Sequence, residues 1–183
     1  MAKVVITAGH SNTDPGAVNG NITEAEITTD MRNIVAYCLK DLDIEAVTDG
    51  RGNDNQTLRQ AIKLIKQGEV AIEFHCNAFH LPTAGGVEAL AQAKDKVICQ
   101  KLCEAVSDVM GIPVRGPAAG FKPENSGQHS RLGYVREGGI ILELFFISNP
   151  KELATYQAKK WLIAREIADV IAEHVGVGVG CKA

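Results

Sequence analysis

Two histidines and one glutamate lie in or directly after apolar segments of the chain, where polar side chains are uncommon. His10 follows the apolar segment 3–8, and His75 lies near the end of the apolar segment 70–76. Because parallel α/β sheets bind ligands at the carboxyl ends of their strands, we expect the two imidazoles to meet at one edge of a sheet. Imidazole nitrogens are common zinc ligands, so the pair predicts part of a metal site.

A third ligand is needed, because a catalytic zinc ion usually has three protein ligands and one open position. Glu24 and Glu26, at the start of the first expected helix, are the candidates. Thr23 and Glu26 have the spacing of a capping box, which gives Glu26 a structural role. Glu24 precedes Ile27 by three residues and Met31 by seven, so it points as the apolar helix face does. We therefore favour Glu24 over Glu26 as the third ligand.

Glu143 is the only charged residue in the apolar segment 140–146. Burying an unpaired carboxylate there would cost several kcal/mol, on the order of a lost buried ion pair. Glu143 therefore needs a partner, a shifted pKa or access to a cleft, and a water on the metal would supply the partner. Strand alternation predicts that Glu143 shares a face with Ile141 and Phe145.

Three more polar residues are candidates for the surroundings of the site. Glu73 and Asn77 each lie two residues from His75, so they share its strand face and could orient a ligand or contact substrate. His129 lies in a polar loop, where it either lines a substrate groove or is solvated; the composition of the loop favours solvation. Each candidate alone has an ordinary structural explanation, and only the combination favours a metal site.

The elements that must position these residues alternate between strand and helix patterns, which predicts an α/β fold. Strands are expected at residues 3–8, 44–48, 70–76, 87–91 and 140–146. Helices are expected at 24–42, 55–67, 94–110 and 150–175, and a long loop at 111–127. No linker divides the chain, so we expect one catalytic domain over residues 1–175 and a flexible C-terminal tail over 176–183.

Composition excludes several classes of function. The 183 residues are 45% hydrophobic and carry a net charge of −3, which gives no basis for binding nucleic acid or an anionic membrane. No apolar run is long enough for membrane insertion. The five cysteines have no CxxC spacing and are expected to be free thiols in a reducing compartment. Without a signal peptide, the product is expected to be cytoplasmic on synthesis.

Six segments carry a family resemblance: ITAGHS at 6–11, DPGA at 14–17, Thr23-Glu24, EFHCNA at 73–78, GGVE at 85–88 and LELFFISN at 142–149. In this order and spacing they resemble the type-3 family of zinc N-acetylmuramoyl-L-alanine amidases, from about residue 4 to about residue 175. The family often has an acidic residue where Thr7 or Ala8 stands, and a serine where Glu73 stands. These departures change no ligand but alter the expected surroundings of the metal.

The resemblance implies a mixed six-stranded sheet flanked by helices on both faces. It also implies one zinc ion per chain, held by His10, Glu24 and His75, with Glu143 in catalysis. The substrate would be peptidoglycan, cleaved by a zinc-activated water between N-acetylmuramic acid and L-alanine of the stem peptide. The small size and missing signal peptide favour a phage or prophage endolysin, which acts on the wall after release. The alternatives are a bacterial autolysin, another zinc hydrolase such as a carboxypeptidase or deacetylase, a non-catalytic wall-binding protein, and a metal-free structural protein.

Overall fold

The computed structural model describes residues 1–124, 126 and 132–178. Its main sheet has six strands in the order β4-β1-β5-β8-β6-β7. Their bounds are β1 Lys3–Ala8, β4 Glu45–Thr48, β5 Ala71–Asn77, β6 Glu88–Ala91, β7 Phe121–Pro123 and β8 Ile140–Phe146. Strands β4, β1, β5 and β8 are parallel, whereas β6 runs antiparallel to β8. The sheet is therefore mixed, and the carboxyl ends of β1, β5 and β8 lie at one edge.

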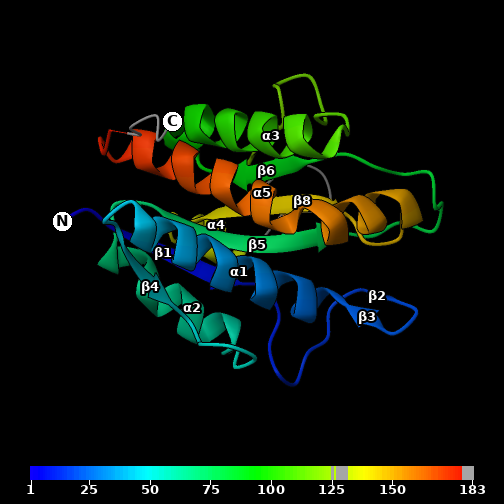
Figure 1. Cartoon of the computed structure of the whole chain (residues 1–183), viewed down its shortest axis with the longest axis horizontal. Coiled ribbons are helices and arrows are strands. Elements are labelled where there is room, and N and C mark those ends of the chain that lie inside the picture. The colour runs from blue at the N-terminus through cyan, green and yellow to red at the C-terminus, as the bar shows by residue number, and fades with distance from the viewer. Residues whose placement is uncertain (125, 127–131, 179–183) are drawn as a thin grey trace.

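Helices cover both faces of the sheet, as expected (Figure 1). One face packs against α1 (Glu24–Asp41), α3 (Lys96–Met110) and α5 (Pro150–His174). The other face packs against α2 (Leu58–Leu64), the 3₁₀ turn Ile65–Gln67 and the short α4 (Gly133–Arg136). Another 3₁₀ turn, Ala93–Asp95, precedes α3. Apolar side chains on both sheet faces explain why these strands read as continuous hydrophobic runs.

Local sequence accounts for the ends of the long helices. Thr23 caps α1, and its side chain accepts a hydrogen bond from the backbone N–H of Glu26. Asn149 caps α5 in the same way, and Pro150 occupies the first helical position, where a missing N–H costs nothing. The α3 helix ends at Gly111, whose φ of 69° is a left-handed conformation that favours glycine. These signals explain why the expected helices agree with the structure to within a few residues.

The sequence-based description was wrong in two places. The expected loop 111–127 contains β7, a three-residue edge strand that is too short to show alternation and ends in Pro123. The second error concerns β8, where His75 pairs with Glu143 but Asn77 pairs with Phe146, which leaves one extra residue in β8. This β-bulge breaks the alternation. Phe145 therefore faces the α5 side, where it stacks on Tyr156, and does not share the face of Glu143.

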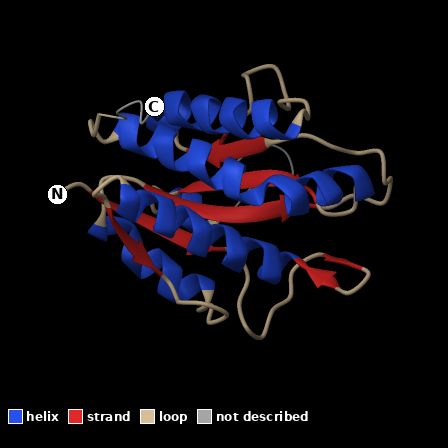
Figure 2. Ribbon diagram, in the orientation of Figure 1, coloured by secondary structure: helices blue, strands red, loops and turns tan. Residues whose placement is uncertain are grey.

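Four smaller features complete the fold. Strands β2 (Val18–Asn19) and β3 (Ile22–Thr23) form a hairpin just before α1 (Figure 2). The thiols of Cys38, Cys76, Cys99 and Cys103 are free, as expected, and Cys181 lies outside the described residues. Within the described ranges, no helix is long and apolar enough to span a membrane. The backbone N–H of Val177 bonds to the Ala172 carbonyl, so a hydrogen-bonded turn follows α5. Residues 179–183 of the expected flexible tail lie outside the described residues.

Candidate metal centre

His10 lies in the turn that directly follows β1. Its φ is 69°, a left-handed conformation that non-glycine residues seldom adopt. Gly9 before it must lack a side chain, because a Cβ atom there would collide with the ring of His75. The two imidazole rings consequently approach edge to face, with their centroids 5.2 Å apart. The turn thus brings His10, from the end of β1, against His75 near the end of β5.

Glu24 lies between the two imidazoles. Its carboxylate oxygens are 2.9 Å from Nε2 of His10 and 3.1 Å from Nδ1 of His75. The carboxylate also accepts hydrogen bonds from the backbone N–H groups of Ala17 and Cys76, at 3.0 and 2.9 Å. These contacts to the loop before α1 and to β5 fix its orientation at the first residue of α1.

Glu26 has the separate role that the capping-box argument predicted. Its carboxylate accepts the backbone N–H of Thr23 at 2.8 Å, and its own N–H donates to the Thr23 hydroxyl at 3.2 Å. The side chain of Glu26 is exposed, whereas that of Glu24 is buried. The structure therefore brings Glu24, and not Glu26, to the two histidines.

The outward ring nitrogen of each histidine also meets a carboxylate. Nδ1 of His10 is 3.1 Å from Asp14, and Nε2 of His75 is 3.1 Å from Glu73. In metal sites, a carboxylate on the second ring nitrogen fixes the tautomer and raises the basicity of the ligating nitrogen. The contact of Glu73 with Thr7, at 3.3 Å, anchors this carboxylate at the position where the family often has serine.

The donor set fits a zinc ion. His10, Glu24 and His75 each offer a ligand atom, and these atoms all lie within 4.8 Å of one another. Two imidazoles and one carboxylate are a common set of protein ligands in catalytic zinc sites. Gly16 makes room for the set, since a Cβ there would lie 2.6 Å from the His10 ring and 2.7 Å from Glu24. The three side chains thus form a site typical of a metal-dependent hydrolase.

The electrostatics of the site favour a cation. Burial lowers the pKa of His10, but hydrogen bonds to Glu24 and Asp14 outweigh burial and raise it above its usual value. For His75 the same balance, with Glu24 and Glu73 as partners, leaves the pKa well above normal. Burial opposes ionisation of Glu24, yet its bonds to both histidines hold its pKa below the usual range. In the metal-free protein these shifts favour protonated imidazoles around an ionised carboxylate, so the carboxylates of the site attract positive charge.

Glu143 lies beside this set on the neighbouring strand. It pairs with His75 of β5 on one side and with Glu88 of β6 on the other, so the three side chains share a sheet face. Its Oε2 atom is buried and has no hydrogen-bond partner among the described residues. Burial raises the pKa of Glu143 to about 7, and the nearby carboxylates of Glu24 and Glu88 add to the shift.

The remaining sequence candidates have mixed outcomes. Asn77 is half-buried and donates to Glu88 at 3.1 Å, so it contacts the site through Glu88 rather than through His75. His129 lies outside the described residues. Sequence reasoning missed Glu88, which is buried between Arg115 and Lys122 at 2.7 Å from each. The signal that identified Glu143, a carboxylate in an apolar strand, is present there too.

A cavity of about 360 Å³ opens next to the two histidines. His10, Glu73 and His75 contribute its polar part, whereas Leu58 and Ile141 contribute apolar wall. The cavity lies between the sheet and α2 and α4, on the same sheet face as Glu143. An α/β sheet with a two-histidine, one-carboxylate site and an adjoining cavity defines the molecule as a metallohydrolase.

A family model described as N-acetylmuramoyl-L-alanine amidase matches residues 4–173. The chain therefore belongs to the N-acetylmuramoyl-L-alanine amidase family, a zinc-type family of peptidoglycan hydrolases, as the sequence resemblance implied. A search of curated proteins found no significant match.

Solved structures agree with this assignment. The chain is 52% identical to a protein from Neisseria meningitidis assigned as an N-acetylmuramoyl-L-alanine amidase, with a TM-score of 0.90 and 97% of each chain covered. The catalytic domain of the amidase CwlV from Bacillus (Paenibacillus) polymyxa is 25% identical, with a TM-score of 0.84 and coverage of 97% and 100%. The catalytic domain of CD27L, an endolysin targeting Clostridia difficile, shares the fold at 18% identity, a TM-score of 0.72 and coverage of 94% and 98%.

Proposed function

We propose that this chain binds one zinc ion through His10, Glu24 and His75, and that Glu143 is the catalytic carboxylate. The bond cleaved is the amide between the lactyl group of N-acetylmuramic acid and L-alanine of the stem peptide. The observation that carries the proposal is the placement of an unpartnered, buried carboxylate oxygen beside a three-residue ligand set. A buried carboxylate without a partner costs stability, so its position is best explained by a reaction that uses it.

The residues of the chain divide the chemistry among them. A bound zinc ion supplies a Lewis acid that polarises the scissile carbonyl and makes water more acidic. Glu143 takes a proton from the attacking water at Oε2 and returns it to the leaving nitrogen of L-alanine. Without metal, burial raises the pKa of Glu143 to about 7, and a carboxylate that titrates near neutral pH can both accept and release a proton. Asp14 and Glu73 keep the two imidazole rings oriented.

Metal analysis tests the ligand assignment. We expect about one zinc per chain in the wild type, and loss of zinc in His10→Ala and His75→Ala. Glu26→Ala is the matched control, because Glu26 lies in the first turn of the same helix and its carboxylate bonds, within the described residues, to Thr23 alone. That variant should keep both zinc and activity. A site that empties in Glu26→Ala but stays loaded in Glu24→Ala would show that the assignment is wrong.

We also propose that the protein acts as a phage or prophage endolysin, which is stored inside the cell and reaches the wall after release. The four free thiols of the described residues support storage in a reducing compartment. Expression in a bacterial host should leave cells intact until the membrane is permeabilised, and lysis should follow at once. If the expressed protein degrades the wall of host cells whose membrane is intact, it is instead an exported autolysin.

A further inference from the structure

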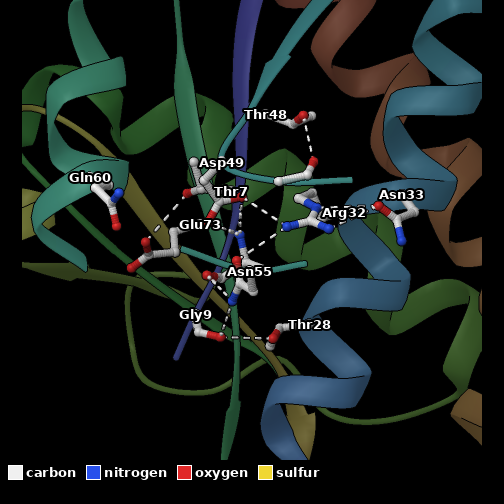
Figure 3. A network of polar contacts seen from close by, with 12 residues as sticks. Thr7, Gly9, Thr28, Arg32, Asn33, Thr48, Asp49, Asn55, Gln60 and Glu73 are labelled. Carbon is white, nitrogen blue, oxygen red and sulfur yellow. Dashed lines mark hydrogen bonds and ion pairs between the residues drawn. The ribbon is translucent and has the colours of Figure 1, made fainter. Parts of the chain in front are cut away.

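A buried polar network contacts the turn that carries His10. Figure 3 shows its side chains near Gly9, the residue before His10. The network consists of Arg32 from α1, Asp49 after β4, and Asn55 from the loop before α2, and we call these three residues the clamp. All three are buried, and the side chains of Arg32 and Asp49 have no exposed surface. Burying an ion pair of this kind seldom adds stability over apolar packing, so its role needs another explanation.

Asn55 contacts the backbone of the His10 turn directly. Its side-chain amide donates to the carbonyl oxygens of Ala8 and His10, at 3.1 and 3.0 Å, and lies 3.3 Å from that of Gly9. The hydroxyl of Thr28 donates to the Gly9 carbonyl at 2.9 Å. Three successive carbonyl groups, at the point where β1 stops pairing, are therefore satisfied by side chains from other elements.

Arg32 fixes which way the Asn55 amide points. Its Nη1 atom donates to the Asn55 side-chain oxygen and to Asp49, at 3.2 Å each. An oxygen held by Arg32 leaves the Asn55 nitrogen facing the turn. Asp49 links Arg32 to β1, because its carboxylate accepts a hydrogen bond from the backbone N–H of Ala8 at 3.3 Å.

The far side of Arg32 is also fully bonded. Its Nε and Nη2 atoms donate to Asn33, at 3.3 and 3.1 Å, and Nη2 donates to the Gly52 carbonyl at 3.1 Å. Gly50 must stay a glycine, since a Cβ there would collide with the Asp54 backbone and lie 2.9 Å from Arg32. The loop backbone is therefore packed around a guanidinium group with little freedom to move.

We propose that Arg32, Asp49 and Asn55 are positioning residues that hold the His10 turn in its left-handed conformation and thereby set the zinc affinity of the site. The strained φ of His10 persists only if its surroundings impose it. The clamp supplies that constraint through both the N–H and the carbonyl of Ala8 and the carbonyl of His10. This inference rests on the proposed zinc site, but the clamp itself can be tested without metal.

The variant Asn55→Asp separates clamping from packing. Aspartate has nearly the same shape and still accepts from Arg32, but it cannot donate to the carbonyls of Ala8 and His10. We expect its zinc affinity, measured by chelator competition, to fall at least about tenfold. The control is Asn33→Ala, which removes contacts to Arg32 without touching β1. Its affinity should stay within about twofold of wild type.

Hydrogen exchange in the metal-free protein supplies a second readout. The backbone N–H of Ser11, which bonds to Asp14 across the turn, should exchange faster in Asn55→Asp than in wild type or Asn33→Ala. If Asn55→Asp does not fold, Asn55→Ala carries the same test, because it also removes the donor to the carbonyls of Ala8 and His10. If exchange is faster in Asn55→Asp but the wild type binds no zinc, the role of the clamp in holding the turn is supported and the proposed metal site is refuted. Unchanged exchange or unchanged zinc affinity in a folded variant would overturn the proposal.

Discussion

Glu24 and Glu143 are both buried close to His75, yet their surroundings shift their pKa values in opposite directions. Burial opposes the charge of Glu24, but hydrogen bonds from His10 and His75 hold it ionised. Oε2 of Glu143 has no hydrogen-bond partner in the described part of the chain, so burial dominates and the pKa of Glu143 rises to about 7. Two carboxylates with separated pKa values are a common basis for separate chemical roles. Glu24 suits a ligand, and Glu143 suits proton transfer.

The first prediction concerns turnover in Glu143→Gln. Glutamine keeps the shape of the side chain but cannot take a proton, so activity should fall at least about a hundredfold. Zinc content should stay at the wild-type level, because Glu143 is not among the three proposed ligands. A turbidity assay on cell walls, with elemental analysis of the same sample, measures both quantities. A variant that still turns over cell wall would show that the base is another residue, with Glu73 the first candidate.

The same substitution predicts a pH-dependent change in stability of the metal-free protein. A folded-state pKa near 7, against an ordinary value of 4.5, means that the wild type loses stability as pH rises through this window. Glu143→Gln has no such loss. The free energy of unfolding of Glu143→Gln minus that of the wild type should therefore increase by about 2 kcal/mol from pH 5 to pH 8. Urea unfolding at both pH values measures the difference, and a constant difference would refute the raised pKa.

At the level of elements, the ends of β1 and β5, the middle of β8 and the start of α1 bring the site together. β1 and β5 deliver the histidines at one sheet edge, β8 places Glu143 beside His75, and the first residue of α1 supplies Glu24. The first N–H groups of α1 are satisfied by the capping box and by the carbonyls of Pro15 and Ala17, so the Glu24 side chain is not needed as a cap. Capping and ligation are therefore divided between two glutamates only two positions apart.

This division predicts that Glu26→Ala is a stability variant only. Loss of the capping box should lower the free energy of unfolding by about 1 kcal/mol. Zinc content and turnover should not change, since Glu26 contacts neither histidine. Denaturant unfolding and a wall-hydrolysis assay on one preparation check both parts. Unchanged stability together with reduced turnover would reverse the roles given to the two glutamates.

Sequence patterns predicted the elements that have strong periodicity or caps, together with the residues that stand out within them. His10, His75 and Glu143 stood out because polar side chains are rare in apolar strands. Arg32, Asp49 and Asn55 did not, since one lies on a polar-rich helix and two lie at loops where polar residues are ordinary. Their partners are fixed by tertiary packing, which spacing along the chain does not encode.

The errors in the strands have the same origin. An edge strand as short as β7 has too few residues to show a period. The bulge in β8 depends on pairing with β5, a contact between segments far apart in sequence, so Phe145 was assigned to the wrong face. Strand β7 and the bulge in β8 are both defined by pairing with other strands, which the sequence pattern alone does not contain.

At the level of the whole molecule, the sheet edge concentrates carboxylates around two imidazoles, so protons and metal compete for the same nitrogens. The pKa values of His10 and His75 are both raised above 6.5 by these carboxylates. Zinc binding must displace a proton from each imidazole. Zinc affinity should therefore depend on pH through a range where an ordinary histidine is already neutral.

We expect the logarithm of the apparent zinc association constant to rise with a slope of about two per pH unit below the raised pKa values, and to level off only above pH 6.5. Chelator competition between pH 5.5 and pH 8.5 measures the slope. An affinity that does not change between pH 5.5 and pH 6.5 would show that the two imidazoles are not the ligands.

The central claim is that zinc, held by His10, Glu24 and His75, is required to cleave the amide between N-acetylmuramic acid and L-alanine. The most direct measurement is product analysis on purified peptidoglycan, with the protein as isolated, stripped of metal by chelator, and reloaded with zinc. The account predicts new free amino groups on L-alanine without new reducing sugar ends, no release after stripping, and recovery on reloading. Full amine release by the stripped protein, or reducing ends in place of amines, would contradict it.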